Sequence, residues 1–263
     1  MQIKDLQNIG SRLYQEMPGI LHSDTSRVSS GIGAGGDMTF GIDRIAEEII
    51  IRGLKELAIP LTMISEEAGI IALHGGGPKV IIDPVDGSKN AVSGIPFYCT
   101  SIAVADGETI GDLRLAYIIN LLTGDQFSAV RGEGAFLNDR QIFTQKGGEL
   151  SLVAYEAQAP GHDIPAALPL LGRARKTRCF GSTALDLAHL AAGAVSVFIC
   201  PSPSRSFDFA GGWLLAREAG GVMTDTKGRS IEGVQLGLER SAALLAAGNQ
   251  ELHDRALKLL WPE

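Results

Sequence analysis

The stretch VIIDPVDGSKN, residues 80–90, decides which fold this sequence can take. Its apolar start predicts the end of a short buried strand, and Pro84 stops the strand ladder because it has no N–H to donate. Asp83 and Asp86 therefore stand three residues apart at one strand end, where their charges repel each other. Carboxylate and carbonyl oxygens are the ligands that Mg²⁺, Mn²⁺ and Ca²⁺ prefer. The stretch therefore predicts a site for a divalent cation.

The residues after these aspartates suggest what such a cation would act on. Gly87 and Ser88 stand at a predicted helical turn, where free backbone N–H groups favour a phosphate. A metal ion beside a phosphate-binding turn is the outline of a phosphoryl-transfer site. Taken alone, however, Asp-Pro and Asp-Gly are common turn pairs, so DPVD by itself would indicate a simple turn.

Three further acids occupy the ends of predicted elements. Glu66 and Glu67 follow the strand-like run LTMIS, and Asp208 begins the predicted helix DFAGGWLLAREAG. Each has an ordinary explanation when taken alone, as a solvated pair or as a helix N-cap. Together with the two aspartates of DPVD, they predict one convergent site of carboxylates.

Composition excludes several classes of protein. The chain has 263 residues, of which 45% are hydrophobic and 20% charged, as in a soluble globular enzyme. A net charge of -7 argues against a general binder of nucleic acid or membrane surfaces, which would carry a basic patch. The three cysteines form no CxxC pair that would indicate zinc or a disulfide framework. With no signal-peptide pattern and no apolar run long enough for a membrane span, we expect a cytoplasmic protein.

The order of predicted elements indicates a layered α/β fold. Helices are expected at 1–22 and 41–58, and the Ser/Gly-rich segment 22–41 between them is expected to be a mobile loop or a glycine-laden turn. Strands, mainly antiparallel, follow between 61 and 130, and FLNDRQIF extends the sheet. After Gly147–Gly148, strands and helices alternate. We expect an N-terminal α+β unit at 1–148 and a C-terminal α/β unit at 149–263, with the site at their junction.

The motifs ISEEAG, IIDPVDGSKN and SFDFAGGWLLAREAGGVMTD, taken together, resemble the inositol monophosphatase family of Mg²⁺-dependent, lithium-sensitive phosphatases. The resemblance runs from about Asp37 to Asp225. The lead GIGAGGDMTFGIDRIAEE resembles the archaeal branch, whose members often hydrolyse both inositol phosphates and fructose bisphosphate. The resemblance implies an αβαβα sugar-phosphatase-like fold. It also implies a phosphoric monoester hydrolase that acts on inositol 1-phosphate, fructose 1,6-bisphosphate or both by means of metal-activated water.

The resemblance also assigns roles to residues. It implies two or three Mg²⁺ ions, with Mn²⁺ as a possible substitute and Li⁺ as a possible inhibitor. The metal ligands it implies are Glu66, Asp83, the backbone oxygen of Val85, Asp86 and Asp208. Asp43 and the Ser88 hydroxyl would orient the attacking water, with Glu66 as a further catalytic residue. The substrate-binding residues it implies are Asp86, Gly87, Ser88, Gly181, Ser182, Thr183 and Asp208.

One departure from the family bears on the substrate. Members that favour inositol phosphate carry a glutamate shortly before the late aspartate, whereas FICPSPSRSFD has none and offers Arg205, which suits a second phosphate. This favours a bisphosphate such as fructose 1,6-bisphosphate. A 3′-phosphoadenosine 5′-phosphate phosphatase and a catalytically silent phosphosugar-binding regulator are the alternatives. The expected partners are a small-molecule phosphomonoester and a second copy in a homodimer, with no nucleic acid and no membrane.

Overall fold

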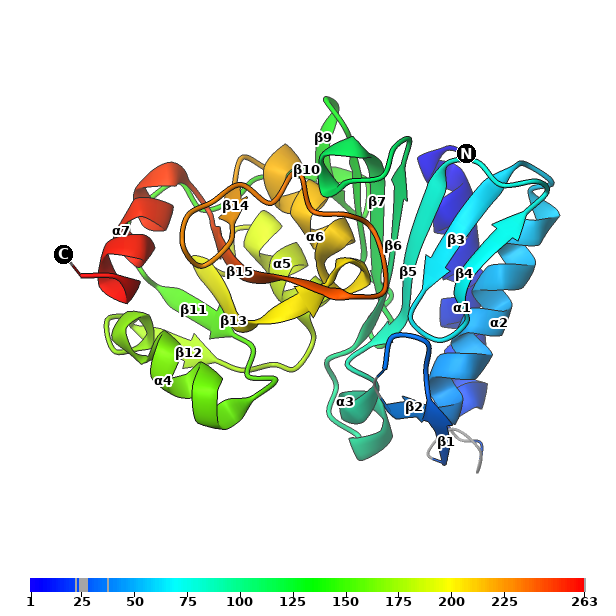
Figure 1. Cartoon of the computed structure of the whole chain (residues 1–263), viewed down its shortest axis with the longest axis horizontal. Coiled ribbons are helices and arrows are strands. Elements are labelled where there is room, and N and C mark those ends of the chain that lie inside the picture. Colours follow the sequence, from blue (N-terminus) through cyan, green and yellow to red (C-terminus); the bar gives the residue numbers. More distant parts are fainter. Residues whose placement is uncertain (22, 24–27, 37, 263) are drawn as a thin grey trace.

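The structure, a computed structural model, describes residues 1–21, 23, 28–36 and 38–262. It consists of five layers in the order helices, sheet, helices, sheet, helices (Figure 1). The layered α/β architecture expected from the sequence is therefore confirmed. No helix among the described residues is long and apolar enough to cross a bilayer.

An eight-stranded sheet forms the larger layer. Its strands are β3 (Leu61–Ser65), β4 (Gly69–Leu73), β5 (Lys79–Asp86), β6 (Cys99–Ala105), β7 (Leu113–Asn120), β8 (Gln126–Val130), β9 (Gly134–Leu137) and β10 (Arg140–Ile142). They lie in the order β10-β9-β8-β7-β6-β5-β3-β4. Only β3 and β5 pair in parallel, because the short connections elsewhere allow hairpins but no crossover. The expected mainly antiparallel sheet, with FLNDRQIF continuing it, is confirmed.

Two long helices cover the outer face of this sheet (Figure 1). They are α1 (Ile3–Leu21) and α2 (Gly41–Glu56). Each is amphipathic: Leu6 and Leu13 of α1 and Ile50 and Leu54 of α2 are fully buried, at the spacing of one helix face. This face packs on alternate residues of the strands, such as Ile82 of β5. The packing fixes β5, which carries both aspartates of DPVD.

A five-stranded sheet forms the second half of the molecule. It consists of β11 (Leu152–Tyr155), β12 (Lys176–Arg178), β13 (Val197–Arg205), β14 (Val222–Thr224) and β15 (Arg240–Ala247), in the order β12-β11-β13-β15-β14. Helices α5 (Thr183–Ala191) and α6 (Ser206–Glu218) lie between the two sheets, and α4 (Pro160–Leu171) and α7 (Gln250–Leu260) cover the far side (Figure 1). A short helix, α3 (Ser88–Ser93), and a 3₁₀ turn (Ile110–Asp112) complete the chain.

The main core is continuous across the two halves. It contains Ile118 of β7, Leu187 of α5, Trp213 of α6 and Leu244 of β15 in one buried cluster. The chain passes from one sheet to the other between β10, which ends at Ile142, and β11. The boundary at 148/149 falls within this connection and stays a prediction.

Three local predictions need correction. The glycine-rich segment is not simply a loop: β1 (Ser29–Ile32) and β2 (Met38–Phe40) form an antiparallel hairpin, although residues 22, 24–27 and 37 of the expected loop lie outside the described part. Strands β4 and β12 were not expected. Asp208 does not open its helix, because α6 begins at Ser206.

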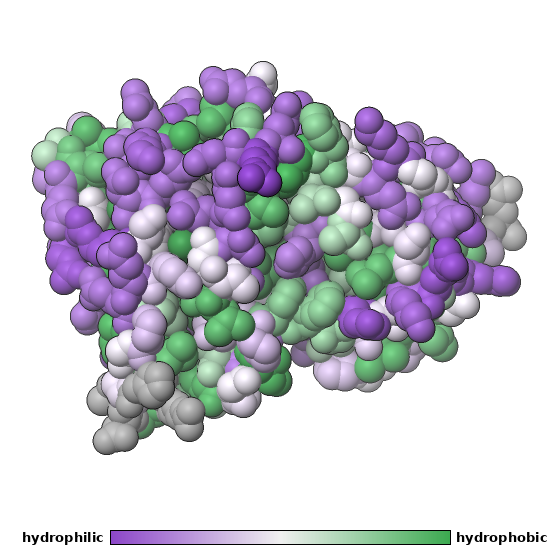
Figure 2. All heavy atoms as spheres, turned by 180° about the vertical axis from the view of Figure 1, so that it is seen from behind, coloured by the Kyte–Doolittle hydropathy of each residue, from purple (hydrophilic) through white to green (hydrophobic). Residues whose placement is uncertain are grey.

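The surface seen from behind is mostly hydrophilic, with hydrophobic atoms in smaller patches between charged side chains (Figure 2). Exposed large hydrophobic residues are spread over different elements, including Ile70 of β4 and Leu168 of α4. Scattered exposure of this kind is ordinary for a folded chain.

Candidate active site

An irregularity in β5 brings the two aspartates of DPVD to one side of the sheet. In a regular strand, residues three apart point to opposite faces. Here Asp83 pairs with Ser101 of β6 while Asp86 pairs with Cys99, so β5 has one residue more than its partner. Such a bulge reorients side chains locally. Pro84 lies inside it, and its carbonyl oxygen accepts a hydrogen bond from Thr100 Oγ1 at 2.6 Å.

Four carboxylates expected from the sequence, together with that of Glu156, line one cavity of about 440 Å³. Glu66 follows the end of β3, Asp83 and Asp86 come from β5, and Asp208 comes from the first turn of α6. The cavity therefore lies where the eight-stranded sheet meets the helices and segments of the second half. This is the convergent carboxylate site that the spacing of acids in the sequence predicted.

Mutual repulsion and burial perturb these acids. Burial raises the pKa of Asp83 well above its ordinary value, and the charges of Glu66, Asp86 and Asp208 raise it further. Burial likewise raises the pKa of Asp86 to about 7. Within the described part of the chain, the buried Oδ1 of Asp83 has no hydrogen-bond partner. A buried acceptor of this kind, surrounded by other acids, is a poor arrangement for protein alone and a suitable one for a cation.

Asp86 is held in place by the start of helix α5. Its Oδ2 accepts hydrogen bonds from Ser182 Oγ at 2.7 Å and from the backbone N–H of Ala184 at 2.6 Å. Ser182 is the N-cap of α5, and its Oγ also accepts from Leu185 N. These bonds lock the carboxylate across the junction of the two halves, and both end on the same oxygen, Oδ2.

A tight glycine turn closes the cavity beside Asp86. Gly87 has a φ of +90°, and a Cβ there would stand 3.0 Å from Phe97 O and 3.1 Å from Gly181 O. Glycine is therefore required by both conformation and space. Asn90 reinforces the contact by donating from Nδ2 to the carbonyl oxygens of Phe97 and Phe180, at 2.8 and 2.6 Å.

The acid pair after β3 supports the hairpin. The N–H of Gly35 donates to Glu66 O at 2.7 Å, and Thr39 Oγ1 donates to a carboxylate oxygen of Glu67. A buried acid that sequence reasoning did not single out, Glu47 of α2, accepts from Ser65 Oγ at 2.5 Å and from Ala68 N at 2.9 Å. Glu47 thus fixes the turn that aims Glu66 into the cavity.

The late aspartate takes part in a helix cap rather than starting the helix. Asp208 is the third residue of α6, and its Oδ2 accepts the N–H of Arg205 at 2.9 Å. Arg205 is buried, and its guanidinium lies 5.9 Å from the centre of the Phe207 ring. Arg205 is therefore not a surface residue, but it is also not among the residues that line the cavity.

The structure brings most of the predicted site residues together. Those that line the cavity are Glu66, Asp83, Val85, Asp86, Gly87, Ser88, Gly181, Thr183 and Asp208. Ser182 lies behind Asp86 through its hydrogen bond. Asp43 is buried in α2, where its Oδ2 accepts Phe40 N at 2.7 Å, and burial raises its pKa to about 7. Its charge adds to the perturbation of Asp83, which places it near the site without making it a lining residue.

Sequence reasoning missed other residues of the cavity wall. They are Met38, Lys89, Glu156, Ala157, Gln158 and Arg240. Lys89 directly follows Ser88 and could have been found from the motif. Gln158 and Arg240 lie in segments without any motif, so only the fold brings them to the site.

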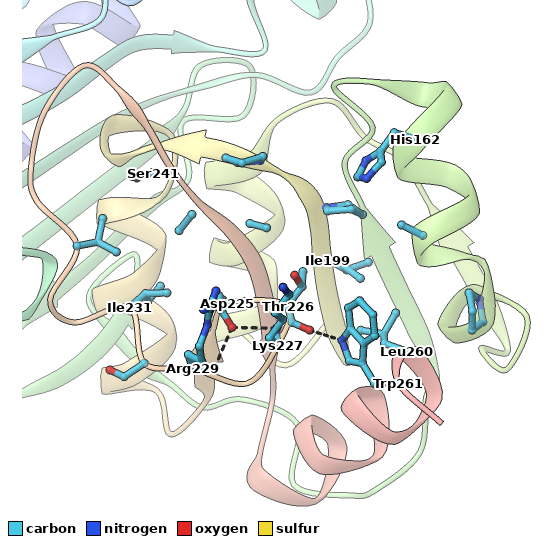
Figure 3. Close-up of a pocket in the computed structure, with 18 of the residues that line it drawn as sticks. His162, Ile199, Asp225, Thr226, Lys227, Arg229, Ile231, Ser241, Leu260 and Trp261 are labelled. Atoms are coloured by element: carbon cyan, nitrogen blue, oxygen red, sulfur yellow. Dashed lines mark hydrogen bonds and ion pairs between the residues drawn. The ribbon is translucent and has the colours of Figure 1, made fainter. Parts of the chain in front are cut away.

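A second, larger cavity of about 760 Å³ lies elsewhere, against the outer face of the five-stranded sheet (Figure 3). Ile199, Ile231, Leu260 and Trp261 contribute its apolar walls. Its one lining acid, Asp225, is occupied by an ion pair with Arg229 (Figure 3). With no group of carboxylates, this cavity does not fit the metal chemistry of the first.

The donor set of the carboxylate cavity fits hard divalent cations, because all its donors are oxygens. Within the described residues, no three acidic, histidine or cysteine side chains are already gathered closely enough to hold an ion. The observation that best supports a bound cation is the buried Oδ1 of Asp83, which has no hydrogen-bond partner within the described residues.

The site and fold define a class of protein, a phosphatase with a carboxylate-lined centre. The model of the inositol monophosphatase family matches residues 8–263. The chain is 34% identical to the fructose-1,6-bisphosphatase/inositol-1-monophosphatase of Methanothermobacter thermautotrophicus over 87% of this chain and 85% of the relative. It is 30% identical to the bifunctional NADP phosphatase/NAD kinase of Methanococcus maripaludis, over 94% of this chain and 47% of that protein.

A solved structure agrees with these relatives. The MJ0109 gene product, described as an inositol monophosphatase–fructose 1,6-bisphosphatase, has a TM-score of 0.84 and 26% identity, covering 98% of this chain and 100% of that one. The chain therefore belongs to the inositol monophosphatase family and is a phosphoric monoester hydrolase. The resemblance to the archaeal branch with both activities is confirmed.

Proposed function

We propose that this protein is a Mg²⁺-dependent phosphatase of small sugar or cyclitol phosphates, with fructose 1,6-bisphosphate and inositol 1-phosphate as its substrates. The observation that carries the proposal is the cavity in which five carboxylates meet beside the Gly87 turn, with Asp83 Oδ1 buried and unpartnered within the described residues. Two relatives have fructose-1,6-bisphosphatase in their names, and these names support the choice of substrate.

Glu66, Asp83, Asp86, Asp208 and the carbonyl of Val85 would hold two or three Mg²⁺ ions. When bound, the ions supply a water of lowered pKa and neutralise charge on the phosphate. Mn²⁺ fits the same oxygen donors. We assign Li⁺ the role of inhibitor on the family resemblance alone.

The chain's own residues orient the reactants. The turn at Gly87 and Ser88 lines the cavity next to Asp86, where backbone N–H groups can receive the phosphate. We assign the Ser88 hydroxyl and Asp43 the role of directing the attacking water. Gly181 and Thr183, at the start of α5, form the wall that would contact the sugar or cyclitol. Ser182 keeps Asp86 in place rather than touching substrate.

The remaining assignments rest on the family. We propose a homodimer with no nucleic-acid or membrane partner, located in the cytoplasm. The exposed Ile164 and Leu168 of α4 offer apolar surface for a subunit contact. Light scattering of the purified protein measures the subunit number directly, and a monomeric mass at micromolar concentration would contradict the dimer.

The test of the substrate is phosphate release with Mg²⁺ from inositol 1-phosphate, fructose 1,6-bisphosphate, 3′-phosphoadenosine 5′-phosphate and NADP in parallel. The proposal expects the first two to be hydrolysed faster than the nucleotides. A preference for NADP would move the protein toward the phosphatase function named for the Methanococcus maripaludis relative, and a preference for 3′-phosphoadenosine 5′-phosphate would support the other nucleotide phosphatase. Metal binding without any turnover would identify a phosphosugar-binding regulator.

A further inference from the structure

We propose that Arg240, positioned by Gln158, binds a second anionic group of the substrate. The site would then favour phosphomonoesters that carry another phosphate over those that carry none. This inference rests on the proposed function of the same cavity, and it assigns specificity to two residues that lie outside every motif of the sequence.

The two side chains stand on the wall contributed by the second half of the molecule. Arg240 is the first residue of β15, and Gln158 follows β11 by three residues. Both line the cavity. Of the acids proposed to bind metal, Asp83 and Asp86 come from β5 in the other sheet, whereas Asp208 comes from α6 of the same half. A ligand whose reacting phosphate lies at Asp83 and Asp86 therefore has Arg240 on a separate wall of the same cavity.

Hydrogen bonds define where the guanidinium lies. Arg240 Nη1 donates to Gln158 Oε1 and, at 3.0 Å, to the carbonyl oxygen of Pro203. Gln158 in turn donates from Nε2 to Ser204 Oγ at 3.3 Å. An arginine held in this way loses less conformational freedom when it binds a ligand. Gln158 is therefore a positioning residue for Arg240.

Most charged side chains that line the cavity are acids, so a ligand with two phosphates needs a positively charged side chain near its second phosphate. Five of the lining residues are acids: Glu66, Asp83, Asp86, Glu156 and Asp208. Bound cations would neutralise the acids at the reacting phosphate, but a second phosphate would still meet an acidic surface. Only two lining residues of the described chain are cationic, Lys89 and Arg240. Lys89 adjoins Ser88 at the reacting end, whereas Arg240 stands on the other wall.

Arginine also has the appropriate donor geometry. Its planar guanidinium can give two parallel N–H bonds to phosphate oxygens, which a lysine cannot. Arg205, which the sequence suggested for this task, is only 7% exposed and lies against Phe207, outside the lining. The cavity of about 440 Å³ has the size of a small-ligand site. Arg240 is thus better placed than Arg205 to read a second phosphate.

The experiment compares two substrates that differ only in the second phosphate, fructose 1,6-bisphosphate and fructose 1-phosphate, in the Mg²⁺-loaded protein. We expect Arg240→Ala to raise KM for the bisphosphate about tenfold or more, the usual effect of losing a charged hydrogen bond, with kcat little changed. The KM and kcat for fructose 1-phosphate should stay within about twofold of the wild-type values. Gln158→Ala should give a smaller loss in the same direction, and Arg240→Lys should restore only part of the affinity.

Arg229→Ala is the matched control, because it removes the same charge from the neighbouring cavity (Figure 3). The inference would be overturned if Arg240→Ala raised KM equally for both substrates, or if Arg229→Ala raised KM for the bisphosphate as much as Arg240→Ala does. If the wild type hydrolyses neither sugar phosphate, the proposed function fails. Calorimetric binding of fructose 1,6-bisphosphate to the wild type and Arg240→Ala then decides the inference by itself: weaker binding in the variant supports it, and unchanged binding refutes it.

Discussion

Replacing Asp86 by asparagine separates the stability of this site from its function. Both hydrogen bonds to the carboxylate, from Ser182 Oγ and Ala184 N, end on the same oxygen. The carbonyl oxygen of an asparagine can accept both, so Asp86→Asn keeps the contacts with α5. It removes one negative charge from a cavity that also contains Asp83 and Asp208.

The pKa of Asp86 gives the expected size of the effect. It lies at about 7 instead of the ordinary 3.8, mainly because of burial. Each tenfold change in ionisation is worth about 1.4 kcal/mol, so ionised Asp86 destabilises the metal-free fold by about 4 kcal/mol at pH 8. This shift already includes the hydrogen bonds from Ser182 and Ala184, which lower the pKa of Asp86. The stabilisation by Asp86→Asn is therefore about 4 kcal/mol, or about 8–16 °C in Tm for a chain of this size.

The raised pKa of Asp86 determines how the stabilisation by Asp86→Asn changes with pH. Because the folded protein binds this proton more tightly than the unfolded chain, the penalty is full above pH 7 and shrinks as the pH falls toward 4. In EDTA, Asp86→Asn should therefore exceed the wild type in Tm at pH 8, and the difference should shrink as the pH falls and nearly vanish at about pH 4. Calorimetric scans of both proteins and of Asp254→Asn, which changes an exposed acid of α7, make the comparison. A variant less stable than the wild type at pH 8 in EDTA would refute the reasoning.

Three further predictions concern the same cavity. Mg²⁺ should bind more weakly at pH 6 than at pH 8, with proton release, because Asp43 and Asp86 have a pKa of about 7; titration calorimetry in two buffers measures both. Gly87→Ala should lower stability by about 1–3 kcal/mol and abolish turnover, whereas Gly147→Ala, with open space around it, should do neither. Ser182→Ala should lower stability by about 1 kcal/mol and reduce kcat, because it removes both the helix cap and a hydrogen bond to Asp86; equal kcat in the two proteins would contradict this.

The local sequence was sufficient to predict those site residues, acids and glycines, that lie at the ends of helices and strands. The order Glu66, Asp83, Asp86 and Asp208 anticipated a single site, because each residue ends or begins a regular element. Pro84 was expected to end the strand, and this was wrong, because β5 continues through Pro84 to Asp86. The bulge between Asp83 and Asp86 is the physical reason that both reach one cavity.

Other features depend on contacts that no local pattern specifies. The glycine-rich segment contains the hairpin β1–β2 because its backbone is held by the carbonyls of Glu66 and Glu67. Gln158 and Arg240 are 82 residues apart and meet only through the five-stranded sheet. Arg205 was indicated by the missing glutamate before Asp208; its side chain lies over Phe207 and outside the cavity lining, and its contact with a ligand stays a prediction.

The most direct test is phosphate release from fructose 1,6-bisphosphate by metal-stripped protein titrated with Mg²⁺, for the wild type, Asp83→Asn and Asp254→Asn. Asp83 is the acid whose buried oxygen lacks a partner within the described chain. The account predicts no release without metal, saturable activation of the wild type and Asp254→Asn, and loss of at least a hundredfold in Asp83→Asn. Full activity in EDTA, or activation of Asp83→Asn equal to that of the wild type, would contradict the claim that this carboxylate cavity is a metal-dependent phosphatase centre.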